Sequence, residues 1–415
     1  MDPKKIILTP YSNTLAHAGR CLILAGELKK RGHEVVLAGS PKYLQDPEIV
    51  KEKGISFYNL PEIDQEEGLA ILRTLGKNLK RSTVMEHIDA ELKMFEVLTP
   101  HLIITDFRLT TYISARKANI PVVSLLGGRW IEKYSREKWK AIKNFPQYPL
   151  IKKTLGKEGA DRVMPFFQHL LHRYKSWPLQ FAFKKYGLKR RKTPGDLLIG
   201  DFNLILDTQL WCPSKDLPEN FRVVGPIYWE PEFPPPAWLE KIDRKRPVIY
   251  LTLGSTGHKD LFYELFKIFA GSNYQILLST GGQTDFSREK IPPNIYLEKY
   301  LPGEEIMKLA DLVIYHGGSG TSYQTIKTGT PAIVIATHIE QEFMGEAVEH
   351  HQVGIFLTML EVMKNPSLIL ESTKRMFANL ETYKKNMEIL KKDLRSYNPV
   401  KAAADGIEDF LRKRQ

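Results

Sequence analysis

The sequence predicts an α/β protein of two doubly wound domains, each with a parallel sheet covered by helices on both faces. Two observations predict this fold. Short apolar runs of strand length alternate with segments of helical spacing, and the alternation occurs twice along the 415 residues. A proline-rich stretch that includes FPPPAW separates the two series. A chain of this length also exceeds what one ordinary core holds.

The first series lies at the start of the chain. Residues 5–10 and 34–39 have strand length, and the helical spacing between them ends at Gly32, a residue type that commonly follows a helix. We expect an N-terminal domain over residues 1–215. Its remaining predicted elements are strands at 102–105 and 121–126 and a helix at 110–119.

The second series has the same plan. We expect a linker over residues 216–247, a C-terminal domain over 248–395 and a final helix over 396–415. Packing of that helix against the N-terminal domain is one arrangement that its apolar spacing allows. The predicted strands of this series are at 248–253, 276–279, 295–297, 312–315, 331–336 and 354–357.

Composition and missing motifs narrow the class of protein. A hydrophobic content of 42% with 26% charged residues is typical of a soluble globular chain. Cys21 and Cys212 stand in no CxxC pattern, so neither a zinc site nor a disulfide framework is expected. The first apolar run is too short for a signal peptide, and we expect a cytoplasmic protein. The sequence lacks P-loop, HExxH and GxSxG motifs, and its nearest approach to a DxD pair, at 89–91, is expected to be solvated helix surface.

The most informative stretch is residues 311–331, DLVIYHGGSGTSYQTIKTGTP. An apolar strand ends at His316 and passes through a glycine-rich turn into a helix. Such a turn lets backbone N–H groups approach an anion, and the helix N-terminus adds partial positive charge. Ser319 and Thr321 can cap the helix or donate to a phosphate, and His316 can donate without a metal. A glycine turn that only packs closely is the alternative for this motif alone.

This stretch resembles the inverting glycosyltransferases of family 1, the UDP-glycosyltransferase group with the GT-B fold. The family pattern is roughly HGGxGTxxExxxxGxP followed by DQ or EQ, and this chain has HGGSGTSYQTIKTGTP and then Glu340-Gln341. The resemblance spans nearly the whole chain. It implies two Rossmann-like domains that face each other across a cleft. It also implies a nucleotide-sugar co-substrate, with UDP the expected nucleotide, and neither a metal nor a cofactor.

The resemblance also implies roles for residues on the donor side. Glu340 and Gln341 would accept hydrogen bonds from the sugar hydroxyls. Gln324 stands where the family usually has a glutamate for the ribose, and Met344 where an asparagine is common, so the donor's identity stays open. The residues that would hold the diphosphate are His316, Gly318, Ser319, Gly320 and Thr321.

Two upstream segments support a donor site. Gly254 and Ser255 follow the first strand of the second domain, at the place of the family's second phosphate contact. Tyr300 and Leu301 lie in the segment that presents backbone to the base and could flank a uracil. A plain turn and simple packing are the alternatives for these two segments.

Two residues of the N-terminal domain are candidates for the chemistry. His17 opens the first helix, and the family has at this place a histidine that removes the proton of the acceptor hydroxyl. Asp106 ends an apolar strand and is the candidate carboxylate that orients this base, at the sheet edge where ligands bind. The implied reaction is a direct displacement with inversion at the anomeric carbon. The alternatives are a structural bond for His17 and a helix N-cap for Asp106.

Nearly all the excess positive charge lies in one block. The chain has a net charge of +12, and residues 129–193 hold 18 Lys or Arg against 4 Asp or Glu. The same block carries 12 of the 43 aromatic residues. It is either a solvated basic helical face or a surface that meets an anionic membrane or an amphipathic acceptor. Nucleic acid is not expected as a partner.

The functional hypothesis is therefore an inverting glycosyltransferase that acts on a hydroxyl of a hydrophobic, lipid-like or small-molecule acceptor. Its place in the cell would be cytoplasmic, with peripheral membrane contact through the basic block left open. Two alternatives remain. One is a nucleotide-sugar 2-epimerase, whose extra carboxylates cannot be matched here. The other is a non-catalytic homologue that binds a partner enzyme, which the presence of His17 and Asp106 disfavours.

Overall fold

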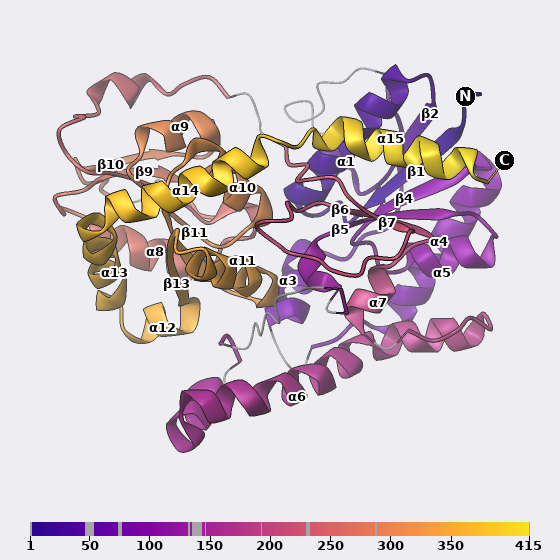
Figure 1. The fold of residues 1–415 in the computed structure, drawn as a ribbon, viewed down its shortest axis with the longest axis horizontal. Coiled ribbons are helices and arrows are strands. Elements are labelled where there is room, and N and C mark those ends of the chain that lie inside the picture. Colours follow the sequence, from indigo (N-terminus) through magenta and orange to yellow (C-terminus); the bar gives the residue numbers. More distant parts are fainter. Residues whose placement is uncertain are drawn as a thin grey trace. The chain divides into compact units, whose positions relative to one another are not determined.

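The computed structural model describes most of the chain, and the described residues form two compact units, each with one parallel sheet (Figure 1). Unit 1 holds Met1–Lys138, Pro165–Trp229 and Tyr397–Gln415, and unit 2 holds Trp139–Met164 and Glu230–Ser396. The described residues are 2–45, 54–73, 77–131, 133–134, 143–145, 147–191, 193–229, 233–286 and 289–414.

The sheet of unit 1 has seven strands in the order β3-β2-β1-β4-β5-β6-β7. The central pair is β1 and β4, and its register ends with Pro10 opposite Asp106. The chain order reverses at this pair, which is where doubly wound sheets bind ligands. The strands are β1 Lys5–Pro10, β2 Glu34–Gly39, β3 Ser56–Asn59, β4 Leu102–Asp106, β5 Val122–Leu126, β6 Phe202–Ile205 and β7 Phe221–Val223.

Helices cover both faces of this sheet because its strands are apolar on both sides. On β1, Ile6 and Leu8 join a core cluster with α1 and α15, while Ile7 between them joins a second cluster with α4. All three side chains are fully buried. The helices of unit 1 are α1 Leu15–Lys30, α2 Pro41–Leu44, α3 Gln65–Arg73, α4 Arg81–Leu98, α5 Thr111–Lys117, α7 Pro194–Leu198, α15 Pro399–Arg412 and part of α6.

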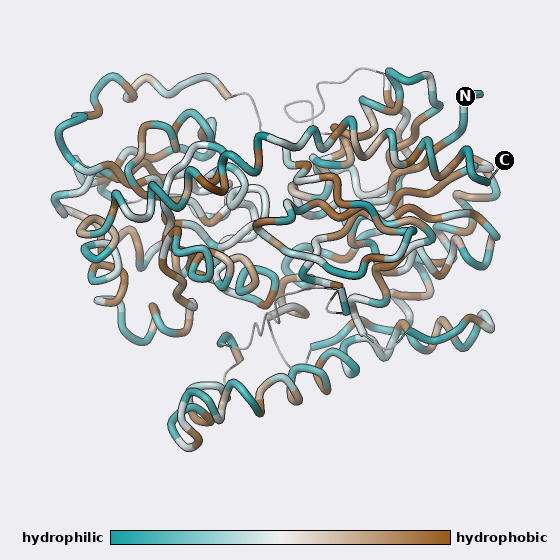
Figure 2. The backbone as a smooth tube through the Cα atoms, viewed as in Figure 1, coloured by the Kyte–Doolittle hydropathy of each residue, from teal (hydrophilic) through white to brown (hydrophobic). Residues whose placement is uncertain are grey.

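The sheet of unit 2 has six strands in the order β10-β9-β8-β11-β12-β13, with its reversal at β8 and β11. Figure 2 shows the strands of both sheets as mainly hydrophobic segments. The strands are β8 Val248–Thr252, β9 Gln275–Ser279, β10 Ile295–Glu298, β11 Leu312–Tyr315, β12 Ala332–Ala336 and β13 Gly354–Thr358. The helices are α8 Lys259–Phe269, α9 Gly303–Leu309, α10 Ser319–Thr328, α11 Ile339–His350, α12 Met359–Lys364, α13 Ser367–Ala378 and α14 Leu380–Leu394.

The chain crosses between the units more often than the sequence predicted. The expected linker at 216–247 contains β7, an edge strand of unit 1, and the chain leaves unit 1 only after Trp229. Residues 139–164, expected in the N-terminal domain, belong to unit 2. A three-residue strand is too short to show a pattern, so β7 could not be predicted. Helix α15 belongs to unit 1, where Ala403 and Ile407 share a core cluster with α1.

Helix α6, Tyr148–Lys185, links the two units along the chain. It is two helices joined at a kink, where Gly156 has a φ of 71° that favours glycine. Its residues up to Met164 belong to unit 2 and those from Pro165 onward to unit 1. None of the helices that the structure describes combines the length and the apolar character needed to cross a bilayer.

Candidate active site

The candidate base lies in the first turn of α1, directly after the central strand of unit 1. The Nδ1 atom of His17 lies 2.8 Å from Oδ1 of Asp106. Both side chains are buried, and the strand register brings them together, because β4 ends with Asp106 beside the end of β1. A carboxylate only accepts, so Nδ1 donates and Nε2 keeps the lone pair that a general base needs. The two catalytic candidates from the sequence therefore form a pair.

A third side chain, which was not predicted from the sequence, contacts the carboxylate of this pair. The Nε atom of Arg20 lies 3.2 Å from Oδ2 of Asp106, and Arg20 is buried on the same helix as His17. The carboxylate thus lies between an imidazole and a guanidinium. The i,i+3 spacing of His17 and Arg20 was the available signal, because side chains three residues apart share a helix face.

Two aromatic rings enclose His17. Phe107 stacks on the imidazole with ring centroids 5.4 Å apart, and the ring of Tyr11 approaches edge-on at 6.3 Å. Phe107 has a φ of 61°, a left-handed conformation that is costly for a residue with a bulky side chain. This conformation places the ring on the base instead of continuing the strand that ends at Asp106.

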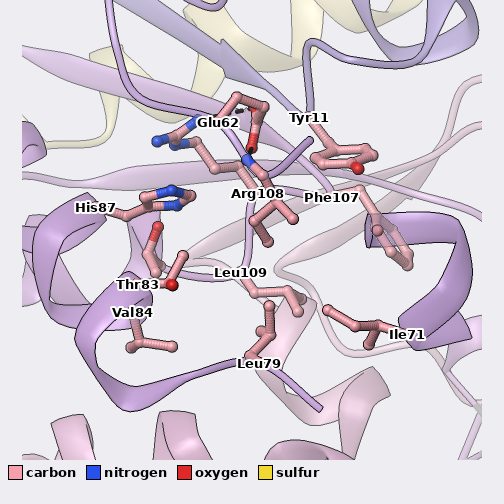
Figure 3. A pocket seen from close by; sticks show the side chains of 13 residues that line it. Tyr11, Glu62, Ile71, Leu79, Thr83, Val84, His87, Phe107, Arg108 and Leu109 are labelled. Atoms are coloured by element: carbon pink, nitrogen blue, oxygen red, sulfur yellow. Dashed lines mark hydrogen bonds and ion pairs between the residues drawn. The ribbon is translucent and has the colours of Figure 1, made fainter. Parts of the chain in front are cut away.

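Tyr11 and Phe107 also line a pocket of unit 1 (Figure 3). Burial, with a contribution from the nearby Arg108, lowers the pKa of His87 in this pocket to about 4, so this imidazole is neutral near pH 7. The pocket is thus an apolar space that shares the rings of Tyr11 and Phe107 with the surroundings of His17. Its apolar lining includes Ile71, Leu79, Val84 and Leu109.

A buried charge network lies along the pocket wall. The guanidinium of Arg108 donates to Glu91 at 2.6 Å and to Glu62 at 3.0 Å. Burial raises the pKa of Glu62, and Arg108 opposes that shift. Glu91 is fully buried, so the expectation that residues 89–91 are solvated surface is wrong for this residue. The polar partners of Glu91 all lie between Arg108 and Ser114, which is too far along the chain for a local pattern to reveal them.

In unit 2, His316 follows β11 and precedes α10, and its ring occupies space left by two glycines. A Cβ atom on Gly254 or on Gly318 would lie 2.7 Å from Cε1 of His316. Gly254 also has a φ of 59°, which favours glycine. The turn at Gly254 and Ser255 therefore lies beside the HGGSGT turn, as a donor site built from both would require.

The N-terminus of α10 supplies backbone donors at the same place. The N–H of Ser322 donates to the carbonyl of Gly318 at 2.9 Å, as the helix begins to bond to itself. The N–H groups of Ser319, Gly320 and Thr321 precede that bond and have no partner within the helix. These amides and the helix dipole favour an anion such as a diphosphate.

Gln341 and Glu340, which are expected to contact the donor sugar, differ in the hydrogen bonds that they can form. The side-chain oxygen of Gln341 accepts from the N–H and from the hydroxyl of Thr337, both at 2.8 Å. Two accepted bonds use both lone pairs, so Gln341 can offer a ligand only its NH₂ group. Thr337 thus already occupies the acceptor oxygen that Gln341 was expected to offer to the sugar. Glu340 is half-buried in the first turn of α11.

The residues expected to flank the nucleobase are less exposed than the sequence implied. Leu301 is buried, which agrees with the packing alternative. Tyr300 is half-buried and stacks on Phe233, with ring centroids 5.2 Å apart and nearly parallel planes. Gln324 is also half-buried and lies near Gly303, where a Cβ would come within 3.3 Å of its amide.

Comparison with known proteins finds relatives that are named as glycosyltransferases. A family model described as "Erythromycin biosynthesis protein CIII-like, C-terminal domain" matches residues 272–406. The "PGL/p-HBAD biosynthesis rhamnosyltransferase" of Mycobacterium bovis (strain BCG / Pasteur 1173P2) is 27% identical over 357 residues, which cover 85% of this chain and 77% of that protein. An "Inactive PGL/p-HBAD biosynthesis glycosyltransferase" of the same strain is 27% identical over 62% of this chain and 69% of that protein.

Solved structures confirm the fold. The glycosyltransferase VinC, in a crystal structure with dTDP, superposes with a TM-score of 0.65 at 16% identity, over 99% of this chain and all of that one. The chain is thus similar over most of its length to proteins named as glycosyltransferases, and it has the GT-B fold. The resemblance to the family 1 enzymes that the sequence indicated is confirmed. In this fold, the catalytic candidates lie in unit 1 and the diphosphate candidates in unit 2.

Proposed function

We propose that this chain is a glycosyltransferase that moves a sugar, with inversion, from a nucleoside-diphosphate donor to a hydroxyl of an apolar acceptor. The observation that carries the proposal is the buried pair of His17 and Asp106, whose neighbouring rings Tyr11 and Phe107 line the apolar pocket of unit 1. A paired imidazole suits proton abstraction, and an apolar pocket suits a hydrophobic or lipid-like acceptor. A cytoplasmic location fits a nucleotide-sugar co-substrate.

The proposed step is one displacement. Nε2 of His17 takes the proton of the acceptor hydroxyl while Asp106 holds the imidazole in place. The acceptor oxygen forms a bond to the anomeric carbon, and the bond from that carbon to the phosphate oxygen breaks. The nucleoside diphosphate leaves with the bonding electrons, and the N-terminus of α10 together with His316 stabilises its negative charge. Protein donors supply this stabilisation, so we propose that the reaction needs no metal.

The donor nucleotide is proposed to be a pyrimidine nucleoside diphosphate. The HGGSGT pattern favours UDP by resemblance, and VinC, which has a similar fold, was crystallised with dTDP. The half-buried Tyr300 is the aromatic candidate for contact with the base. Sugar hydroxyls would meet the carboxylate of Glu340 as an acceptor and the NH₂ group of Gln341 as a donor.

A donor panel with two acceptors tests the proposal. The purified protein is incubated with UDP-, dTDP- and GDP-sugars and either a long-chain alkylphenol or a short water-soluble phenol. Mass spectrometry should detect a glycosylated alkylphenol and free nucleoside diphosphate, and NMR should show the inverted anomer. Activity should survive EDTA. A retained anomeric configuration, or complete loss of activity in EDTA, would overturn this mechanism.

One alternative is favoured by a specific observation, because one similar protein is named as inactive. A non-catalytic homologue would bind a nucleoside diphosphate in calorimetry yet transfer no sugar from any donor to either phenol. The donor panel also separates a 2-epimerase, which would change the donor sugar in the absence of any acceptor.

A further inference from the structure

The second half of α6 has an unusual surface. From Pro165 to Lys185 it exposes large apolar side chains, an adjacent pair followed by residues at intervals of three or four, which places them on one side of the helix. The buried side of the same segment is also apolar, and Leu179 and Phe183 pack there in a core cluster with α4. We call the exposed side the outer face of α6. Its side chains, with their exposed fractions, are Phe166 (63%), Phe167 (46%), Leu170 (46%), Tyr174 (48%), Trp177 (54%) and Phe181 (39%).

Positive charge surrounds the outer face. From residue 162 to 191 the sequence holds eight Lys or Arg and no Asp or Glu. Arg173, Lys184 and Lys185 are exposed on this part of α6. The acidic Asp89 of α4 instead contacts Tyr186, beyond the C-terminal end of the helix. Exposed aromatic rings among cations match an anionic bilayer, where rings lie at headgroup level and cations meet lipid phosphates.

A neighbouring helix strengthens this match in a way the local sequence does not show. The guanidinium of Arg81, the first residue of α4, lies 3.9 Å from the ring centroid of Trp177 and 4.8 Å from that of Phe181. Lys80 beside it is exposed. A segment distant in the chain thus adds cations to the same face.

Residues at the start of α4 contact both the pocket and α6. Leu79 and Val84 line the pocket and also belong to the core cluster that holds the buried side of α6. Arg81, between them in the chain, contacts the outer face. The pocket and the exposed rings are therefore both next to the start of α4, and a surface bound through these rings would lie close to the pocket.

We propose that the outer face of α6 docks this protein reversibly on an anionic membrane. The rings enter the headgroup region, and the flanking cations bind lipid phosphates. The proposal concerns membrane binding and does not depend on the transfer reaction. Within the basic block at residues 129–193, it assigns the membrane contact to one helix face.

Vesicle co-sedimentation of the full chain tests the proposal. At low salt, the protein should bind vesicles of phosphatidylcholine with about one-third phosphatidylglycerol. It should bind vesicles of pure phosphatidylcholine poorly, and rising salt should release it. Equal binding to both vesicles, or binding to neither, would overturn the proposal. Light scattering in the absence of lipid tests whether a second copy of the chain covers the outer face. A dimer that is disrupted by substitutions in the outer face would also overturn the proposal.

Matched double variants locate the surface. Phe166→Ser with Leu170→Ser, and separately Lys184→Gln with Lys185→Gln, should each weaken binding to anionic vesicles by about tenfold or more. The apolar control is Val97→Ser with Ile389→Ser, which changes two exposed side chains elsewhere (64% and 59%). The charge control is Lys384→Gln with Lys385→Gln on α14. Wild-type binding in the outer-face variants, or equal losses in their controls, would contradict the assignment.

Two further measurements separate docking from folding and catalysis. Outer-face variants should keep the wild-type unfolding temperature and wild-type activity on a water-soluble phenol, if such transfer is found. Brominated lipid should quench tryptophan fluorescence in the wild type, and Trp177→Phe should reduce that quenching while binding is retained. Unchanged quenching in Trp177→Phe would place the membrane contact elsewhere.

Discussion

The two units each place a histidine at the carboxyl end of a central parallel strand, yet they surround it differently. His17 of unit 1 lies against the carboxylate of Asp106, which also pairs with Arg20. His316 of unit 2 lies where Gly254 and Gly318 leave room for its ring. A buried carboxylate contacts the first imidazole, whereas two glycines leave space for the second.

This difference indicates two kinds of chemistry. A carboxylate on Nδ1 stabilises the imidazolium that forms when Nε2 takes a proton, so the arrangement around His17 suits a base. Glycines let backbone and imidazole approach a ligand closely, and with the N-terminus of α10 they suit a fixed anion. The sites can therefore be tested separately, one by turnover and the other by nucleotide affinity.

The largest expected effect is on turnover. His17→Ala should lower transfer at least about 100-fold while nucleoside-diphosphate affinity is unchanged, because only the proton acceptor is lost. Asp106→Asn should also impair transfer, since an amide NH₂ facing Nδ1 would move the imidazole proton to Nε2. Transfer kinetics and calorimetry measure both.

The control is His101→Ala, which changes an exposed histidine of the same unit. This variant should transfer sugar as the wild type does. Full activity in His17→Ala would show that the base lies elsewhere and would break the comparison between the two histidines.

The next effect is on nucleotide binding in unit 2. His316→Ala should weaken nucleoside-diphosphate binding by about 1.5–3 kcal/mol, the cost of a lost charge-assisted hydrogen bond. Gly254→Ala should weaken it about tenfold, because the new Cβ would displace the imidazole. Combining the two should add little to His316→Ala alone. Calorimetry with UDP, dTDP and GDP measures these affinities.

Gly271→Ala is a matched control for backbone strain. Gly271 also has a positive φ, of 68°, but a Cβ there would meet no atom within 4 Å. It should cost about 1 kcal/mol of stability and leave nucleotide affinity intact. Equal losses of affinity in Gly254→Ala and Gly271→Ala would show that strain, not the position of His316, is responsible.

The smallest expected effect concerns buried charge. In unit 1, Glu91 meets the guanidinium of Arg108, whereas in unit 2 the carboxylate of Glu342 accepts from the N–H groups of Lys143 and Asn144 at 2.8 and 2.7 Å. Burial raises the pKa of Glu342 from 4.5 to about 7. The folded chain then keeps this proton up to about pH 7, while the unfolded chain releases it near 4.5.

The contribution of Glu342 to stability is therefore greatest at low pH and is lost as pH rises through about 7. Between about pH 6 and pH 8 the free energy of unfolding should fall by about 1 kcal/mol through this group. Urea denaturation at several pH values, followed by circular dichroism, measures the slope. Glu342→Gln should flatten it and Glu349→Gln on the same helix should not; an unchanged slope in Glu342→Gln would refute the assignment.

Much of the fold could be predicted from the sequence, because buried parallel strands are continuous apolar runs. Strands β1, β2, β4 and β5 lie where they were predicted, and so do the six strands of unit 2. Strands β3 and β7 were missed because neither has a buried residue and neither is a continuous apolar run, and in β6 the polar Asn203 interrupts the run. His17 and Asp106 were predicted as a pair from their places at strand ends, and the register of β1 and β4 brings them together.

The sequence by itself determined the local features: strand and helix periods, the HGGSGT turn, the candidate base and the concentration of positive charge. Only the tertiary structure decided which side chains meet and which side of a helix is exposed. Arg108 pairs with Glu91 and so offsets the cost of burying its carboxylate, and Gln341 has no free acceptor because Thr337 bonds to it. Helix α6 is apolar on both sides, so its period could not distinguish the core from the surface. That choice depends on packing against α4, a contact between segments far apart in the chain.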